Sequence, residues 1–495
     1  MRLPQPSGDE RPMKDPTPAP PSSPTGPSHR RKPLLFGLGG MVVALAAAAF
    51  VLWGGRPGAH SRAGEGHGHD HEAKGPQSAA LPAPVEVLRH TDRAARAAAT
   101  GDAATARAAL AEALKLAPEH APALFVQACL ALEAGNDAEA GDALEKLEDA
   151  APGSRELKLL QRLRELRRTP GTSWQQAFRE AWVALGRPDF QKSRLLPGAT
   201  PLPPDPTDAE AEQAAWKRAT SDEAKLMLAL GARKLDAEKG LFLLSQVPKL
   251  EDPALYLAVM DALRGDALPE SSHAEARKVF HDTLVKLAAA HPRSMQLQLL
   301  LLLGDTEQGS VLSAAELAAL EKLAALPAWR ENSFADLYQH ARKVLKDAGA
   351  PDASAMAMTA AARSVMERGS WVLRTRNVGT RGELPPEGVK RLGRINRDIG
   401  SRMLEQPTLA ERMNGLQLIR AGTQDMEEEI GRKLALAQIE ALEAAIKEFQ
   451  KTELARWPLH SLTEELLELT TRDEPAYLLS FAAGAQPARA SGEQH

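Results

Sequence analysis

Apolar residues recur at intervals of three and four along most of the chain beyond about residue 85. This spacing predicts amphipathic α-helices. Residues 173–186 illustrate it, because Trp174, Phe178 and Trp182 lie four residues apart on one predicted helix face and favour core contacts. No run of alternating Val and Ile residues predicts a strand. The pattern therefore predicts an all-α protein.

Helix-start signals repeat through the second half of the chain. A Ser or Thr followed three residues later by Glu is typical of a capping box, in which each side chain bonds a backbone N–H of the first turn. Such pairs precede apolar-periodic runs at Thr207/Glu210, Thr220/Glu223, Ser272/Glu275, Ser313/Glu316, Thr408/Glu411 and Ser461/Glu464. They predict helical hairpins over residues 208–480, arranged either as a degenerate α-solenoid or as a helical bundle.

Two stretches of the chain, residues 101–118 and 135–152, resemble one another and begin 34 residues apart. Each begins at Gly and ends at Pro, and each carries Ala and then Leu at matching positions (Ala106, Leu110; Ala140, Leu144). Glycine can end a helix in the left-handed conformation, alanine lets two helices approach closely, and proline cannot continue a helix. The repeat therefore predicts stacked helical hairpins that bury one shared apolar face.

This 34-residue period resembles the tetratricopeptide repeat (TPR). The matching units are residues 87–120 and 121–154, and residues 156–166 look like the first helix of a third, incomplete unit. The first unit departs from the family, because His90 and Ala97 stand where the family has a large residue and a tyrosine. The resemblance covers only about residues 87–154.

In this family the first helix of each unit lines a concave surface that binds partner proteins. The resemblance places Leu88, Phe125, Cys129 and Leu132 on that surface. The Lys, Arg and Asn residues with which the family clamps a peptide carboxylate are absent there. We therefore expect an apolar groove for an amphipathic helix or an extended apolar segment, with Cys129 acting as a small hydrophobic residue.

The N-terminal region predicts a membrane anchor. Residues 1–33 are rich in proline and predict a disordered tail, and the 20 residues from Leu34 to Trp53 carry no charge. At about 1.5 Å per residue they span a hydrocarbon core of about 30 Å. The basic residues 30–32 precede this segment, so the positive-inside rule leaves the N-terminus in the cytoplasm and the bulk of the chain outside it. The alternative, a cleaved signal peptide ending near Ala46–Ala48, requires an unusually long lead.

Residues 55–84 predict a flexible linker that carries a histidine cluster. His60, His67, His69 and His71 are imidazole ligands that suit Zn²⁺, Ni²⁺ or Cu²⁺. The alternative is a solvated tether with weak, incidental metal affinity, because nothing in a flexible chain preorganises the ligands.

The remaining boundaries follow from composition. After the TPR-like region (85–168) we expect a short helix and a Pro-rich break (169–207), a helical repeat region (208–370), a basic loop (371–388), a C-terminal helical region (389–482) and a flexible tail (483–495). Arg374, Arg376 and Arg381 make this loop basic, and Arg391, Arg394 and Arg402 after it could form a basic helix face for an anionic partner. The preferred interpretation is a solvated face balanced by the acidic residues 425–429.

Composition, net charge and the absence of catalytic motifs exclude several classes of function. Alanine and leucine dominate the apolar content, and the net charge of −4 does not favour nucleic acid as a partner. No nucleotide-binding loop, zinc-protease, hydrolase or dithiol motif occurs, so we expect no enzyme and no cofactor. The sequence predicts a scaffold or assembly factor of a bacterial cell envelope that binds other proteins from the inner membrane. The alternatives are a client-holding chaperone, as TPR proteins act in cytochrome c maturation, a metal-handling protein, and an enzyme whose site is assembled from scattered residues. The oligomeric state is left open.

Overall fold

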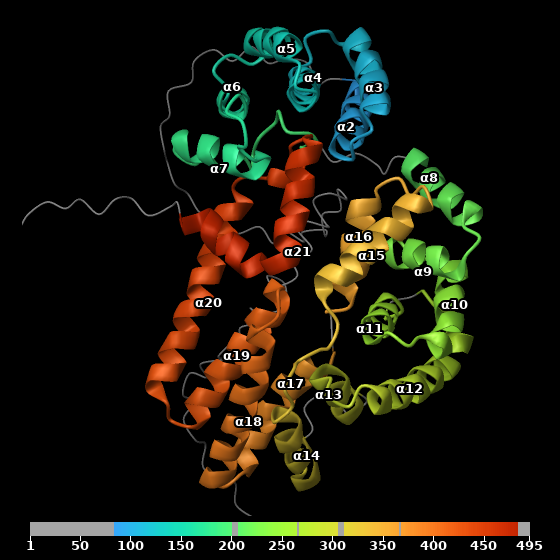
Figure 1. The fold of residues 1–495 in the computed structure, drawn as a ribbon, viewed down its shortest axis with the longest axis vertical. Helices are drawn as coiled ribbons and strands as arrows, with labels where there is room; N and C mark the ends of the chain where they lie inside the picture. Colours follow the sequence, from blue (N-terminus) through green and yellow to red (C-terminus); the bar gives the residue numbers. More distant parts are fainter. Residues whose placement is uncertain (1–83, 200–205, 265–266, 305–310, 366–367, 484–495) are drawn as a thin grey trace, which may run out of the picture. The chain divides into compact units, whose positions relative to one another are not determined.

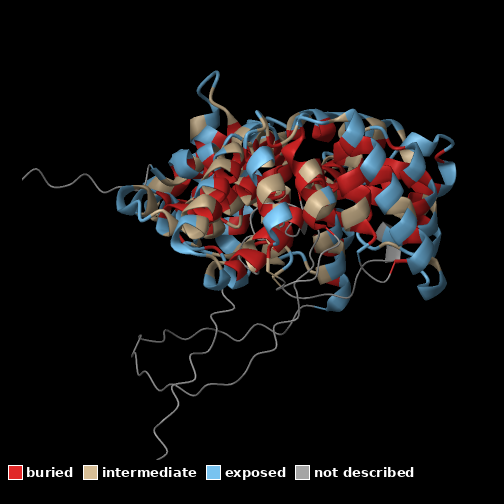
Figure 2. Ribbon diagram, turned by 90° about the horizontal axis from the view of Figure 1, so that it is seen from below, coloured by how far each residue is buried: buried red, intermediate tan, exposed pale blue. Residues whose placement is uncertain are grey.

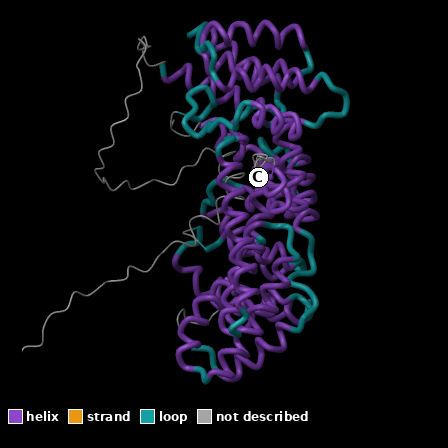
Figure 3. Tube along the Cα trace, turned by 90° about the vertical axis from the view of Figure 1, so that its left-hand side faces the viewer, coloured by secondary structure: helices purple, strands orange, loops and turns teal. Residues whose placement is uncertain are grey.

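A computed structural model of the chain describes residues 84–199, 206–264, 267–304, 311–365 and 368–483. These residues form twenty α-helices and three short 3₁₀ helices (Figure 1). No strand is present among them (Figure 3), apart from one isolated bridge between Ser294 and Ala328. The prediction of an all-helical fold is therefore confirmed for the described residues, and the helices pack as in a bundle or a solenoid.

Most helices follow one another with short connections, whereas residues 185–205 separate α7 from α8. The N-terminal helices are α2 (Val85–Ala99), α3 (Ala103–Leu116), α4 (Ala121–Glu133), α5 (Asp137–Ala150), α6 (Arg155–Arg167) and α7 (Trp174–Ala184). The central elements are α8 (Pro206–Arg218), α9 (Asp222–Gly231), α10 (Ala237–Gln246), η1 (Val247–Lys249), α11 (Pro253–Ala262), η2 (Glu270–Ser272), α12 (His273–Ala290), α13 (Met295–Leu303), α14 (Ala314–Ala324), α15 (Phe334–Asp347) and α16 (Ala353–Arg363). The C-terminal elements are α17 (Arg368–Glu383), α18 (Pro386–Leu404), α19 (Leu409–Asp425), α20 (Glu429–Gln450), η3 (Leu454–Arg456) and α21 (His460–Ala483).

The helices of the repeated stretches form two hairpins, α2 with α3 and α4 with α5. Gly101 and Gly135 connect the two helices of each hairpin with positive φ values of 82° and 69°, a region that favours glycine. The next residue of each connection caps the second helix: the Asp102 side chain accepts a hydrogen bond from the N–H of Thr105, and Asn136 does the same for Glu139. Local sequence thus sets both turns in the same way.

Some of the predicted Ser and Thr residues cap a helix in the structure, and others do not. Ser313 and Glu316 form a complete capping box, and the Thr408 hydroxyl accepts from the N–H of Glu411. Helix α9 is instead capped by Ser221, one residue after the predicted Thr220. Ser272 precedes α12 without a side-chain cap. Ser461 bonds Glu133 of α4, since a tertiary partner competes for its hydroxyl. The Thr207 side chain lies outside the described part.

The predicted basic loop over residues 371–388 is wrong: most of it belongs to helix α17. Glycines and Asn377 lower its helix propensity, but buried contacts stabilise the helix. Asn377 donates to the Asn396 side chain of α18 at 2.9 Å, and the Thr380 hydroxyl accepts the N–H of Leu312 at 2.9 Å. These tertiary partners override the local preference for a loop.

Helices α18 and α19 approach each other closely because each carries two glycines at the contact. A Cβ atom at Gly393 would lie 2.7 Å from the carbonyl oxygen of Gly422. One at Gly400 would lie 2.6 Å from the carbonyl oxygen of Gly415. Only glycine allows backbones to meet at this distance, so this antiparallel pair depends on all four positions.

The last described helix, α21, lies against the first helices of the described chain. Helix α21 contacts α2 and α7 as well as α15, α16 and α19 (Figure 1). A kink at Asp473, followed by Pro475, divides α21 into two halves. Most helices bury one side and expose the other (Figure 2), as expected for amphipathic helices.

Several predictions concern residues outside the described part of the chain. They are the disordered tail (1–33), the membrane span from Leu34 to Trp53, the linker up to residue 83 and residues 484–495 of the tail. Among the residues that were described, no helix has the length and apolar character needed to cross a membrane.

Candidate functional site

The predicted partner-binding groove is not open in the structure. Phe125 and Cys129 of α4 are 0% exposed, and Leu88 and Leu132 are half-buried. Eight of the thirteen residues of α4 are buried, on all sides of the helix. A helix that is apolar all round belongs to a core rather than to a surface. That feature of residues 121–133 is visible in the sequence and argues against an accessible groove.

A segment from the far end of the chain fills the groove. The indole of Trp457, between η3 and α21, lies among three phenylalanine rings at centroid distances of 5.3 Å from Phe125, 5.2 Å from Phe178 and 5.2 Å from Phe190. All three contacts are edge-to-face, an arrangement that stabilises aromatic pairs. Trp457 also donates its indole N–H to the carbonyl oxygen of Thr452 at 2.9 Å, so its one polar atom is satisfied.

Hydrogen bonds hold residues 454–466, here called the closing segment, on the N-terminal helices. Arg456 donates to the carbonyl oxygens of Pro197 at 2.9 Å and Leu196 at 2.7 Å. Glu465 accepts from the backbone N–H groups of Trp174 at 3.1 Å and Gln175 at 2.9 Å, at the start of α7. A carboxylate in that position complements the positive end of the helix dipole.

The start of α21 completes this attachment. Nδ1 of His460 lies 3.0 Å from the carbonyl oxygen of Ala99 at the end of α2. The N–H of Ser461 donates to the Glu133 carboxylate at 3.2 Å, and the Ser461 hydroxyl contacts the same carboxylate. The closing segment, which comprises η3, residues 457–459 and the first turns of α21, therefore packs against the N-terminal hairpins of its own chain.

Cys129 lies in this buried region and is chemically quiet. Burial raises the pKa of its thiol well above the usual range, and the neighbouring Glu133 carboxylate raises it further. The protonated thiol is a poor nucleophile and a poor metal ligand. The structure thus agrees with its interpretation as a small hydrophobic residue.

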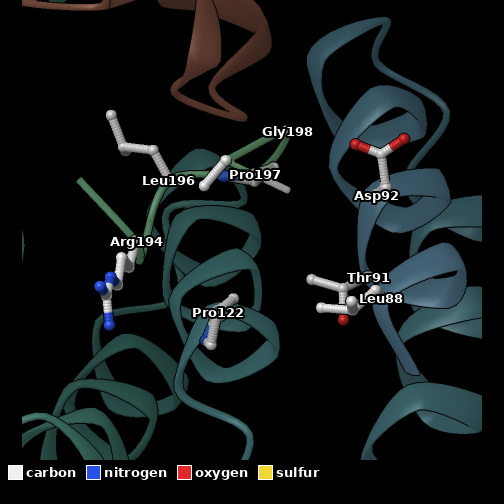
Figure 4. Close-up of a pocket in the computed structure, with 9 residues that line it drawn as sticks. Leu88, Thr91, Asp92, Pro122, Arg194, Leu196, Pro197 and Gly198 are labelled. Carbon is white, nitrogen blue, oxygen red and sulfur yellow. The ribbon is translucent and has the colours of Figure 1, made fainter. Parts of the chain in front are cut away.

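One small cavity remains beside the predicted groove. It has a volume of about 40 Å³ and lies between Leu88, Thr91 and Asp92 of α2, Pro122 of α4, and residues 194–199. Figure 4 shows the α2 side chains on one side and Leu196, Pro197 and Gly198 on the other. Ligand pockets usually have several hundred Å³, so this space holds about one or two water molecules.

The arginines expected to present a basic surface are largely paired inside the protein. Arg376 is buried and forms an ion pair with Glu316 at 2.7 Å. This contact lowers the pKa of the Glu316 carboxyl to about 2. Arg381 pairs with Asp425 at 2.7 Å, which agrees with the predicted balance by residues 425–429. Ion pairing with these two carboxylates therefore balances the charges of Arg376 and Arg381.

The accessible apolar surface lies on α20, where we predicted no site. Ile430 is 86% exposed and Leu434 is 60% exposed, the former the most exposed large apolar side chain described. Three exposed alanines continue the same face, so that the set, here called the α20 stripe, comprises Ile430, Leu434, Ala437, Ala441 and Ala444. The spacing of four, three, four and three residues is readable in the sequence. The sequence pattern did not single out this stripe, because α20 carries a second apolar face of similar spacing, which packs against the core.

The predicted histidine cluster belongs to the linker that precedes the described helices. His60, His67, His69 and His71 lie outside the described residues. Within the described ranges, no group of three or more His, Cys, Asp or Glu residues is arranged to hold a metal ion.

Comparison with known proteins gives no relative. No family model, no curated protein and no solved structure matches the chain. The residues and contacts of this chain are therefore the basis for its proposed function.

Proposed function

We propose that this protein is a non-catalytic scaffold that gathers proteins at a membrane. The α20 stripe carries the proposal, because two large apolar side chains and three alanines lie exposed along one helix face. A contiguous exposed apolar patch is a feature of protein-binding surfaces. The segment from Leu34 to Trp53 supplies the membrane anchor, and the basic residues before it direct the described helices to the extracytoplasmic side.

The N-terminal TPR-like hairpins have a supporting role in this proposal. Their apolar groove holds Trp457 of the closing segment against Phe125, while Arg456 and Glu465 bond Leu196 and the start of α7 beside the hairpins. This attachment fixes α21, and α21 in turn contacts α20. A client-holding chaperone that uses the same groove would first have to displace Trp457 from three aromatic contacts, so the scaffold is the better-supported function.

Site-specific photo-crosslinking of the full chain in membranes tests the binding surface. A photoreactive residue at Ala437, in the middle of the α20 stripe, should give discrete protein adducts. The matched control is Glu443, which is exposed on the same helix but lies outside the stripe. Equal adduct yields at both positions, or none at Ala437, would contradict the proposed binding role.

Reporter fusions test the topology. A reporter that is active only outside the cytoplasm, fused after His60, should be active, because the positive residues precede the apolar segment. Replacing Arg30, Arg31 and Lys32 with neutral residues should reduce that activity. Activity of a cytoplasm-only reporter at the same position would contradict the proposed location.

A further inference from the structure

Helix α20 has two apolar faces, and only one of them is occupied. Ala435, Ile439, Leu442 and Ala445 are buried, and the helix contacts α19 and α21. The α20 stripe lies on the other side and repeats with the alternating spacing of a coiled-coil seam. Most exposed helix faces are polar, so a second seam on this helix fits another helix of similar pattern.

We infer that the α20 stripe binds the same stripe of a second copy of this chain, with the two helices antiparallel about a twofold axis. The inference rests on the proposed function and names the partner of that surface. In one register, Ile430 lies opposite Ala441 of the second copy and Leu434 lies opposite Ala437 of the second copy. The twofold axis repeats each of these two pairs, so every large side chain lies opposite an alanine.

Charge complementarity selects the same register. Lys433 and Glu440 are exposed along one edge of the stripe, at the positions that flank a coiled-coil seam. In the antiparallel register described above, Lys433 lies opposite Glu440 of the second copy, and the axis repeats the pair. Lys433 is only loosely engaged within its own chain, at 3.4 Å from the exposed Glu429.

Other pairings of the two stripes are less complementary. A shift of one heptad places Lys433 opposite Lys447 of the second copy, sets Glu440 against its own equivalent and brings Ile430 opposite Glu448. A parallel pairing places the large side chains opposite each other and sets Lys433 opposite Gln438. Neither arrangement pairs opposite charges, and like charges across a helix interface weaken it.

Sedimentation equilibrium of the full chain in density-matched detergent tests the inference. The wild type should sediment as a dimer. Leu434→Glu should be monomeric with unchanged helicity, because it places charges in the apolar seam. Lys433→Glu should weaken dimerisation about tenfold, since both ion pairs become like-charge contacts. Adding Glu440→Lys to that variant should restore dimerisation by exchanging the charges.

Lys447→Glu is the matched control, because Lys447 is exposed on the same edge but has no charged residue opposite it in this register. It should leave dimerisation unchanged. A monomeric wild type, a dimer that survives Leu434→Glu, or a failure of the charge exchange to restore dimerisation would overturn the inference. A monomeric wild type that still forms Ala437 adducts with other proteins would overturn only the second copy as partner and leave the scaffold function standing.

Discussion

The indole ring of Trp457 packs edge-on against the phenyl ring of Phe125, with the ring centroids 5.3 Å apart, and joins the C-terminal helices to the N-terminal hairpins. Both side chains are fully buried. The contact explains why the apolar groove of the hairpins does not face solvent. It also makes the N-terminal helices dependent on residues near the end of the chain.

Removing this indole should destabilise the protein strongly. Trp457→Ala should lower the free energy of unfolding by about 3–5 kcal/mol, because it leaves a cavity among three phenylalanine rings and removes the aromatic contacts with them. Phe125→Glu should unfold the N-terminal hairpins, since it buries an unpaired charge. Urea unfolding of the full chain measures both. Val378→Ala, at a position 70% exposed, should change stability by less than about 0.5 kcal/mol. A small effect of Trp457→Ala would mean that the closing segment is not bound in solution.

Breaking the ion pair between Glu316 and the buried Arg376 should lower the free energy of unfolding far more than breaking the more exposed pair between Glu321 and Arg391. Glu316→Ala leaves the Arg376 guanidinium buried without that carboxylate and should cost about 3–5 kcal/mol. The side chains of Arg391 and Glu321 are 39% and 53% exposed, so Glu321→Ala should cost at most about 1 kcal/mol. Denaturant titrations at neutral pH compare the two. Equal costs would show that Arg376 is solvated rather than buried.

Two glycine substitutions should have opposite effects. Gly400→Ala places a methyl group 2.6 Å from the carbonyl oxygen of Gly415 and should destabilise the α18–α19 pair by about 1–3 kcal/mol. Gly382→Ala adds a methyl group in α17 where no atom lies within 4 Å, and should stabilise the helix by up to about 1 kcal/mol. Thermal unfolding distinguishes them. Stabilisation by both would contradict the close helix approach.

Glu474 should make stability fall as pH rises. Burial raises the pKa of its carboxyl to about 7, although the N–H of Leu409 donates to it at 2.9 Å. Because the folded-state pKa lies above the unfolded value of about 4.5, its contribution is fully present below that value. It is lost as the pH rises through about 7.

Comparison with Glu474→Gln isolates this contribution. Between about pH 4.5 and pH 8, the stability of the wild type relative to this variant should fall by an amount on the order of 3 kcal/mol. Glu468→Gln, on the exposed side of α21, should leave the pH dependence unchanged. Parallel wild-type and Glu474→Gln curves across this range would show that Glu474 does not titrate there.

The sequence by itself determined the helices and the turns of the N-terminal hairpins, because these depend on neighbouring residues. Asp102 and Asn136 each cap a helix with their own side chain, and Gly101 and Gly135 adopt positive φ values. Ser313 and Glu316 form their capping box for the same local reason. Trp174, Phe178 and Trp182 are buried, as their four-residue spacing predicted.

Only the tertiary structure decided which apolar faces are covered and which remain accessible. By repeat position Phe125 and Cys129 lie in a groove, but both are buried, and Trp457 from a distant part of the chain packs on Phe125. The α17 segment resembles a loop, but Arg376, Asn377 and Thr380 find buried partners on other elements. The α20 stripe and the buried face of the same helix have similar apolar periodicity, and contacts with α19 and α21 cover only one of them. Periodicity specifies that a face is apolar, whereas the path of the whole chain determines what packs against it.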